Sequence, residues 1–205
     1  MSAPPDVRGA RADEKDAIAT ILTDAFVDEA GLNYWLRQGA AKDRARRRFF
    51  DAALEDAIHP EREVWVAEDS GERLGAAIWL GPGRKAYDFG LLKQLAFSPL
   101  FFEIAGIGGS MRGLSVGEKL HTLHPHAPHA HLVFLGVSPS AQGRGVGSAI
   151  LKATLAPVDQ AGLIAFLETT TERNVALYRR HGFEVTGELK LPTFTLWGMT
   201  RAPRA

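Results

Sequence analysis

A cluster of glycines between an apolar segment and a helical pattern constrains this chain more than any other feature. Residues 132–137 are apolar and end at a Ser-Pro pair, and apolar residues resume at helical spacing from Ala149. This order predicts a buried strand, a turn, and a helix that begins at about Gly145. Glycines let backbone amides approach an anion closely, and the dipole of the following helix favours negative charge. Residues 142–148 are therefore predicted to bind phosphate.

The spacing of the glycines excludes two common phosphate loops. A P-loop ends in Gly-Lys-Ser or Gly-Lys-Thr, and the chain contains no Lys-Ser or Lys-Thr pair. A dinucleotide-binding loop has the spacing Gly-x-Gly-x-x-Gly at the start of a βαβ unit. Here Gly143, Gly145 and Gly147 alternate, and they lie late in the sequence.

A second pattern follows about thirty residues later. Residues 163–168 are predicted to form another buried strand. Asn174, Leu177 and Tyr178 then share one helix face, and Gly182 is placed to end that helix. The spacing alone also allows Tyr178 to be an ordinary core residue of an amphipathic helix.

The composition limits the class of protein. The 205 residues predict one domain, 1–205, and the 24 basic and 24 acidic side chains give zero net charge, so we expect no nucleic acid and no membrane partner. The absence of cysteine excludes disulfides, thiolate nucleophiles and cysteine-ligated zinc. Residues 1–16 lack the apolar core of a signal peptide, and residues 89–109 are too often interrupted to span a membrane. We expect a cytoplasmic protein.

The first half of the chain predicts two helices and then two strands. The helices cover residues 13–30 and 41–58, and the strands cover 64–68 and 74–80. Four arginines in the second helix lie among acidic residues and are predicted to form a solvated face: Arg44, Arg46, Arg47 and Arg48. Residues 83–123 are predicted to form a helical insert. This insert can form one wall of an acceptor pocket, form the interface of a homodimer, or pack on the sheet as ordinary core helices.

The two glycine-containing patterns carry a resemblance. Gln-Gly-Arg-Gly-Val-Gly behind a Leu-Gly-Val strand resembles the acetyl-CoA pyrophosphate loop of the GNAT acetyltransferases, and Asn174-x-x-x-x-Tyr178-x-x-x-Gly-Phe resembles their later motif. The resemblance implies an α/β fold with a central mixed, mostly antiparallel twisted sheet flanked by helices, a helical insert before the fourth strand, and an acetyl-CoA-binding core at 132–188. It implies these cofactor-binding residues: Leu135, Gly136, Val137, Gln142, Gly143, Arg144, Gly145, Val146, Gly147, Ser148, Asn174 and Tyr178.

Three further segments resemble the puromycin N-acetyltransferase branch of that family. They are the Val-Trp-Val-Ala-Glu-Asp run at 64–69, the Phe-Leu-Glu-Thr run at 166–169, and the closing residues 197–201. Where that branch commonly carries Asp-Pro or Tyr-Pro after the first helix, this chain has Asp-Glu-Ala-Gly at 28–31. Because substrate contacts are expected there, the resemblance does not extend to puromycin as the acceptor.

The resemblance also assigns roles. The pantetheine arm is expected to pair with the strand edge at 135–137, with Gly136 easing a splay of that strand, and Asn174 is expected to bond the same arm. The Val137 amide is the expected donor to the thioester carbonyl, and Tyr178 is the expected proton donor to the leaving thiolate.

His131, six residues before Val137, is the first candidate for the base that deprotonates the amine, directly or through water, and Glu168 is the second. An imidazole base would give a rate that rises with pH through ~6–7. A surface or capping role for His131 stays open.

Five histidines at 121, 124, 126, 129 and 131 raise the question of a metal site. No cysteine joins them, and Pro125 and Pro128 predict an irregular linker rather than one ligand face, so we expect no metal. The function expected from the sequence is direct transfer of acetyl from acetyl-CoA to a primary amine of a small molecule in a ternary complex. The alternatives are an acetyltransferase of protein amino termini or lysines, and an acyl-CoA-binding sensor without turnover.

Overall fold

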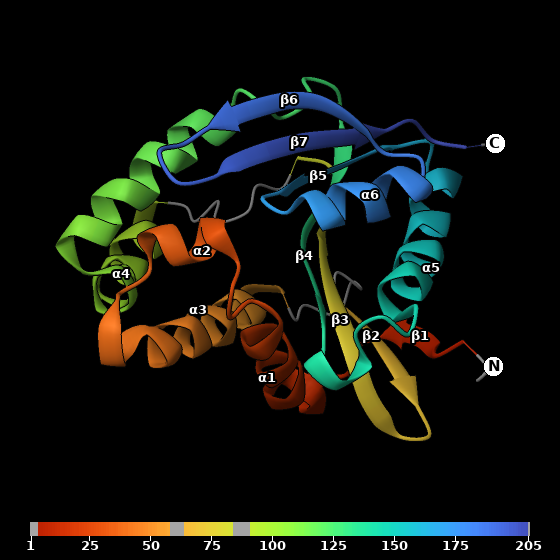
Figure 1. Ribbon diagram of the computed structural model, residues 1–205, viewed down its shortest axis with the longest axis horizontal. Helices are drawn as coiled ribbons and strands as arrows, with labels where there is room; N and C mark the ends of the chain where they lie inside the picture. The colour runs from red at the N-terminus through yellow and green to blue at the C-terminus, as the bar shows by residue number, and fades with distance from the viewer. Residues whose placement is uncertain (1–3, 58–63, 84–90, 205) are drawn as a thin grey trace.

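One mixed sheet organises the molecule (Figure 1). The computed structural model describes residues 4–57, 64–83 and 91–204. Seven strands pair in the order β1-β2-β3-β4-β5-β7-β6, and only the β4–β5 pair is parallel. The mostly antiparallel sheet flanked by helices is confirmed. The strands are β1 (Asp6–Gly9), β2 (Val64–Asp69), β3 (Glu72–Leu80), β4 (His129–Val137), β5 (Ile164–Thr169), β6 (Glu184–Lys190) and β7 (Thr195–Arg201).

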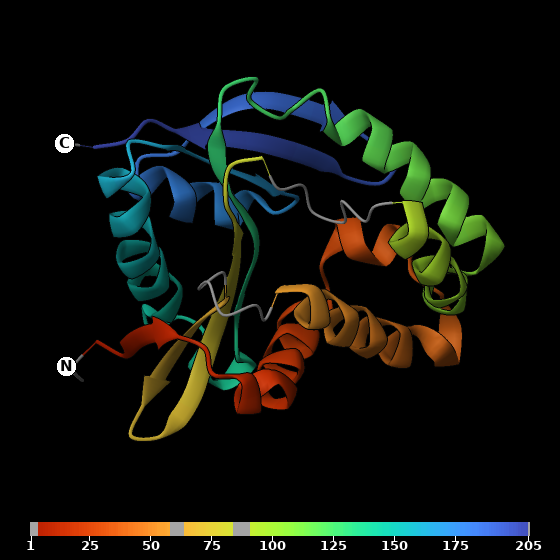
Figure 2. The same ribbon diagram turned by 180° about the vertical axis from the view of Figure 1, so that it is seen from behind.

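Helices cover the sheet in two groups, as Figures 1 and 2 show from opposite sides. The first group lies together at one end of the molecule: α1 (Lys15–Ala25), α2 (Ala30–Trp35), α3 (Lys42–Ala57) and α4 (Leu91–Leu120). The second group is α5 (Val146–Gln160) and α6 (Glu172–Arg180). None of the described helices is long and apolar enough to cross a membrane.

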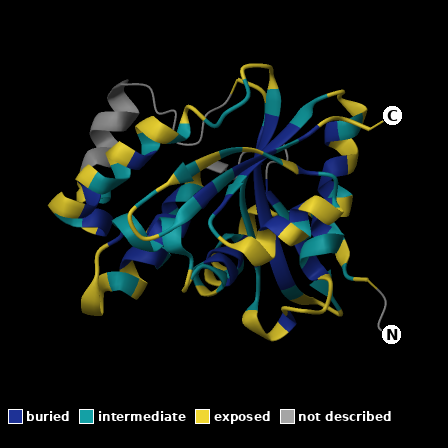
Figure 3. Ribbon diagram, turned by 45° about the horizontal axis from the view of Figure 1, so that its top comes forward, coloured by how far each residue is buried: buried dark blue, intermediate teal, exposed yellow. Residues whose placement is uncertain are grey.

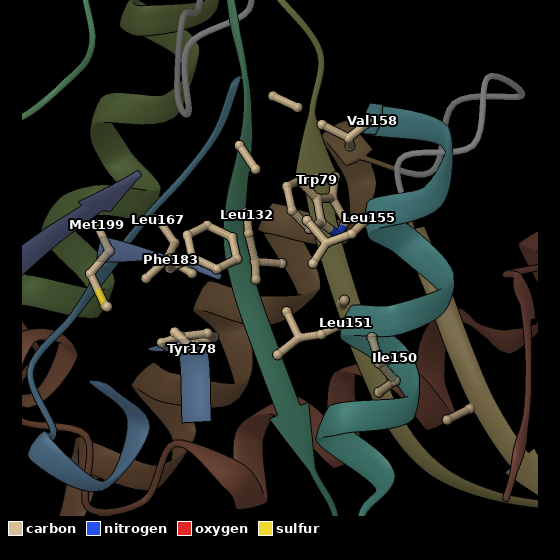
Figure 4. Packing of buried hydrophobic residues seen from close by; sticks show 14 of the residues in the cluster. Trp79, Leu132, Ile150, Leu151, Leu155, Val158, Leu167, Tyr178, Phe183 and Met199 are labelled. Carbon is tan, nitrogen blue, oxygen red and sulfur yellow. The ribbon is translucent and has the colours of Figure 1, made fainter. Parts of the chain in front are cut away.

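Each group buries its own core, and the buried residues concentrate along the central strands (Figure 3). Beneath α5 and α6, Leu132 and Leu167 from the sheet pack with Ile150 and Tyr178 (Figure 4). Beneath α1, α3 and α4 the core is formed by a second cluster that includes Leu22, Phe50, Leu54, Ile78 and Ile104. Side chains alternate across a strand, so one sheet supplies both clusters.

The first predicted helix is two helices. α1 ends at Ala25, where the amide of Phe26 donates to the carbonyl of Leu22, and α2 begins at Ala30. Glu29 caps α2, because its carboxylate accepts hydrogen bonds from two backbone amides of that helix. The hydroxyl of Thr170 also donates to Glu29, which ties this corner to the chain just after β5. The sequence expectation of one helix over 13–30 was wrong at its C-terminal end.

The second predicted helix is α3, but its arginines do not form one solvated face. Arg46 is buried, and its guanidinium donates to the carbonyl of Thr23 at 2.8 Å and to Asp43 at 2.7 Å. Arg44 and Arg48 remain well exposed. The expectation was wrong for Arg46 because α1 packs beside α3 and supplies a carbonyl acceptor. Ile58, the last residue of the predicted helix 41–58, lies outside the described residues.

The described part of the insert is α4, whose helical backbone is interrupted at Gly106 (φ 66°, ψ 177°). One face is core, with Ile104, Ala105 and Val116 buried. The opposite side leaves four large apolar side chains exposed: Phe102, Ile107, Met111 and Leu114. The helical insert before β4 is therefore confirmed as helix. A homodimer through it stays a prediction.

Candidate functional site

Two parallel strands stop pairing in the middle of the sheet, and the predicted site residues gather there. The β4–β5 ladder ends at Leu132↔Leu167, although β4 continues to Val137. Val133 is an extra residue opposite β3, since Ile78 pairs with Phe134 and Trp79 with Leu132. A bulge bends a strand, so the strands diverge from this point, here called the fork (Figure 1).

Gly136, where a distortion of β4 was expected, lies against α1. A Cβ there would lie 2.8 Å from Cδ2 of Leu22 and 3.0 Å from Cβ of Ala25. Both are tighter than ordinary packing allows, so glycine is required because α1 lies directly on β4. That Gly136 eases the splay stays a prediction.

Beyond the fork, the end of β4 keeps one backbone edge that no described strand pairs. The amide of Ser138 donates to the carbonyl of Leu74 on β3 at 2.8 Å. Successive amides of a strand point to opposite sides, so the amide of Val137 points away from β3. The side chain of Gln142 donates to the Val137 carbonyl at 3.3 Å on that same side. Leu135 and Val137 therefore offer backbone groups to a ligand lying in the fork.

The glycine turn folds as predicted, and its geometry fits a phosphate. α5 begins at Val146 with Gly145 as its N-cap, and Gly143 and Gly145 have φ of 77° and 83°. These angles favour glycine, and a Cβ at either residue would meet no protein atom within 4 Å. The space over the turn is thus open to an anion at the start of a long helix. Arg144 is half exposed and lies 4.0 Å from the carboxylate of Asp69.

The start of α5, the end of β4 and α6 meet around Gly147. A Cβ on Gly147 would lie 3.7 Å from side-chain atoms of both Leu177 and Val137. The hydroxyl of Ser148 and Nε2 of His181 are 2.7 Å apart and join α5 to the end of α6. Asn174 is exposed in the first turn of α6, and its side-chain amide has no hydrogen-bond partner among the described residues. It is therefore available to a ligand.

Tyr178 lies on the inner face of α6 (Figure 4). It is 7% exposed, and its ring meets Phe183 edge-on at 5.9 Å. Burial raises the pKa of the Tyr178 phenol above its usual value. The hydroxyl therefore keeps its proton at neutral pH, as a proton donor must.

The two candidate bases form one pair at the fork. His131 precedes the last paired residue of β4, and Glu168 follows the last paired residue of that ladder in β5. By strand alternation both side chains leave the sheet on the face opposite Tyr178. Nε2 of His131 lies 2.6 Å from Oε2 of Glu168. His131 is 5% exposed, and its Nδ1 has no partner among the described residues.

The charges around Glu168 indicate which role each of the two residues, His131 and Glu168, can have. Burial alone would raise the pKa of Glu168, but its electrostatic interaction with His131 and hydrogen bonds from His124 and His131 lower that pKa well below the usual range. The carboxylate is thus an ionised acceptor that orients His131. Nδ1 of His131 is the nitrogen left to take a proton, and the role of Glu168 as the second candidate base stays a prediction.

Sequence reasoning missed His124. Residues 121–128 are irregular, as expected, but they turn back so that the His124 ring lies 4.5 Å from that of Phe166 and 5.0 Å from that of His131. Nε2 of His124 is 3.1 Å from Oε1 of Glu168. The expectation that the prolines keep these histidines off one face was wrong. The density of histidines before β4 was the only signal in the sequence.

The side chains of His124, His131 and Glu168 lie close enough together to raise the question of a metal site again. One nitrogen each from His124 and His131 and an oxygen of Glu168 lie within 4.8 Å of one another. Ligand atoms around tetrahedral zinc stand about 3.3 Å apart. The 2.6 Å contact of His131 with Glu168 is that of a charge-assisted hydrogen bond. We therefore interpret the cluster as hydrogen-bonded, and the absence of a metal stays a prediction.

Comparison with known proteins agrees with this geometry. A sequence model described as the acetyltransferase (GNAT) family matches residues 30–183. The chain is 24% identical over 177 residues to an uncharacterized N-acetyltransferase of Schizosaccharomyces pombe, covering 83% of this chain and 70% of that protein. It is 32% identical over 132 residues to a mycothiol acetyltransferase of Geodermatophilus obscurus, covering 62% of this chain. That match spans only 37% of the Geodermatophilus protein.

A solved structure is similar over nearly its whole length. The crystal structure of "histone acetyltransferase HPA2 and related acetyltransferase" from Corynebacterium glutamicum superposes with a TM-score of 0.75 and 25% identity. It covers 99% of this chain and 98% of that one. The likeness to the puromycin N-acetyltransferase branch stays a prediction.

Proposed function

The chain belongs to the GNAT acetyltransferase family, and we propose that it transfers the acetyl group of acetyl-CoA to a primary amine of a small molecule. The observation that carries the proposal is the fork. A buried tyrosine and a histidine oriented by a carboxylate flank the strands at the point where β4 and β5 separate, and an unpaired strand edge leads from there along β4 toward an open glycine turn.

Binding of the donor follows from the backbone. The amides of the turn at 142–148 would hold the pyrophosphate, with added charge from Arg144. The edge of Leu135 and Val137 would pair with the amide-rich pantetheine arm, as an added strand does. The exposed amide of Asn174 would bond the same arm from α6. A thioester laid through the fork would then reach groups on both faces of the sheet.

The reaction needs a base, a hydrogen-bond donor to the carbonyl oxygen and an acid, and these residues can supply all three. The acceptor ammonium gives one proton to Nδ1 of His131, so that a neutral amine nitrogen attacks the thioester carbonyl carbon in the ternary complex. The second proton on that nitrogen passes to solvent as the amide forms. The Val137 amide stabilises the negative charge that develops on the carbonyl oxygen. As the carbon–sulfur bond breaks, the Tyr178 hydroxyl gives its proton to the leaving thiolate.

Two observations bear on the acceptor. Relatives named mycothiol acetyltransferase favour a small molecule. The similar Corynebacterium structure, whose description names a histone acetyltransferase, favours a protein amine as the second candidate. A panel decides between them: the full chain with acetyl-CoA and small primary amines, peptides with a free amino terminus, or lysine peptides, followed by thiol release and product mass. Turnover of peptides alone would establish the second candidate, and binding without any turnover would establish a sensor.

The cofactor assignment has a matched test. Gly145→Glu places a side chain and a negative charge where the phosphate is expected, so acetyl-CoA affinity should fall by at least ~100-fold in calorimetry. Gly162→Glu is the control, because Gly162 also has positive φ (64°) and open space around a Cβ, but lies in the turn after α5. Equal affinities in the two folded variants would contradict the site.

A further inference from the structure

A chain of hydrogen bonds fixes the protons on three histidines. Nδ1 of His129 is 2.9 Å from the carbonyl oxygen of Ala127, so this nitrogen must donate. Burial lowers the pKa of His129, so the ring is neutral at neutral pH and its Nε2 carries a lone pair. Nδ1 of His124 lies 3.4 Å from that Nε2, so a hydrogen bond across this long contact has His124 as its donor.

The other nitrogen of His124 then faces a carboxylate. Nε2 of His124 is 3.1 Å from Oε1 of Glu168. A neutral His124 that donates from Nδ1 would present a lone pair there to a negative oxygen, which is repulsive. A second proton removes the conflict, since both nitrogens of an imidazolium donate. The geometry therefore calls for a positive charge on His124.

The positive charge completes the arrangement around the base. Glu168 accepts from His131 through Oε2 and faces His124 through Oε1, so both of its oxygens are bonded. The side chains of His124, Glu168 and His131 are 27%, 15% and 6% exposed. A carboxylate so little exposed needs a compensating charge. His124 supplies it from the side nearest solvent.

We propose that His124 is a positioning residue of this site: as an imidazolium bonded to Glu168, it holds the carboxylate against Nε2 of His131 and offsets its negative charge. The inference rests on the proposed role of His131 as base. The positive charge of His124 offsets the negative charge of Glu168, which would otherwise favour the protonated form of His131. Nδ1 of His131 therefore stays without a proton and can receive one from the acceptor.

The consequence is a defined shift of the pH–rate profile. The ionisable groups facing His131 are Glu168 from β5, His129 from its own strand and His124 from the linker. The ring of His121 is tilted by 45° to that of His124, with 6.3 Å between the ring centroids. Removing the charge of His124 leaves Glu168 to favour the protonated form of His131. The acidic limb of kcat in His124→Gln should therefore move to higher pH by about one unit.

Two further variants separate charge from packing. His124→Lys keeps a cation beside Glu168 and should hold the limb near its parental position. His126→Gln is the matched control, because His126 is exposed in the same linker, and it should leave the profile unchanged. A His124→Gln variant that loses rate without moving the limb would reduce His124 to a structural residue and overturn the proposal.

Nitrogen NMR of the full chain with labelled imidazoles tests the protons without any turnover. At pH 7, His124 should show both nitrogens protonated, and His131 should show a bare Nδ1. A neutral His124 overturns the proposal, and a neutral His124 whose Nε2 responds to added zinc would make the cluster a metal site instead. If His131→Gln leaves rate and profile unchanged, the base assignment itself fails. If His131→Gln removes the limb but His124→Gln leaves it in place, only the present inference fails.

Discussion

Tyr178 and His131 lie on opposite faces of one sheet, and the fork is where a bound molecule can meet both. Tyr178 belongs to the apolar cluster under α5 and α6 with Leu132 and Leu167. His131 is the neighbour of Leu132 and so faces the other way. This separation suits an acid and a base that act on different atoms, the leaving sulfur and the attacking nitrogen.

Replacing Tyr178 by phenylalanine tests the acid alone. The ring contact with Phe183 is kept, so acetyl-CoA affinity and stability should change little. The rate should fall by ~10²–10⁴-fold, because the thiolate would leave without a proton. Steady-state kinetics beside calorimetry measure both quantities. A phenylalanine variant within a few-fold of the parental rate would show that the thiolate leaves unassisted or that another acid serves.

Substitutions in the His131–Glu168 pair test which of the two residues is the base. His131→Gln should remove the acidic limb of the pH–rate profile and lower kcat. Glu168→Gln should keep a limb, move it to lower pH, and lower kcat, because the negative charge that favours imidazolium is lost. Glu168 itself cannot produce a limb near neutrality, since its pKa is held well below the usual range. Loss of the limb only in Glu168→Gln would reverse the two roles.

At the scale of elements, α2 and α4 approach so closely that one helix needs glycine. A Cβ on Gly109 would lie 2.1 Å from the carbonyl oxygen of Trp35, and one on Gly113 would lie 3.1 Å from the ring of Phe101. The rings of Trp35 and Phe101 contact each other at 5.5 Å between centroids. Glycine is usually unfavourable in a helix, but here it allows α4 to lie directly against α2.

Two glycines of the same helix make opposite predictions. Gly109→Ala must displace a backbone carbonyl, so it should destabilise the protein by about 1–3 kcal/mol. Gly117→Ala meets nothing within 4 Å and should stabilise it by about 0.5–1 kcal/mol through helix propensity. Urea unfolding of the two variants measures both free energies. A stabilising Gly109→Ala would show that α2 and α4 do not pack as described.

At the scale of the whole molecule, one buried carboxylate joins the first strand to the rest of the sheet. The side chain of Glu14 is fully buried and bonds to Arg8 of β1, Arg73 of β3 and Arg11. Arg8 also donates to Glu68 of β2. The hydrogen bond from Arg8, with help from the Arg11 amide and Arg73, holds the pKa of Glu14 far below its usual value despite its burial.

This cluster predicts the acid sensitivity of the fold. A carboxyl whose pKa is lowered by folding stabilises the native state above its unfolded value of about 4.3, and that stability is lost as the pH falls toward the folded value. Glu14→Gln should cost about 1–3 kcal/mol at pH 7, because three partly exposed arginines lose the charged acceptor of their hydrogen bonds. Its melting temperature should approach that of the parent below about pH 4. A difference independent of pH would show that Glu14 acts by packing alone.

Local patterns were sufficient to predict the elements that we propose bind the donor. The glycine turn, the start of α5, the strand that ends at Val137 and the face of α6 that carries Tyr178 follow from residues close together in sequence. Their positive φ angles and helix faces are set by neighbours within a few positions, so the sequence predicted them. The same holds for α3 and for the hairpin of β2 and β3.

Contacts between distant residues decided the rest. The bulge at Val133, the burial of Arg46 and the separate helix capped by Glu29 each depend on a partner in another element. β1 was missed because its four residues carry no periodicity, and it is stabilised by pairing with β2 and by Glu14. The meeting of His124, His131 and Glu168 joins a linker to two strands. A chain's sequence determines its local backbone preferences, whereas the neighbours of a buried charge are set only when the sheet has assembled.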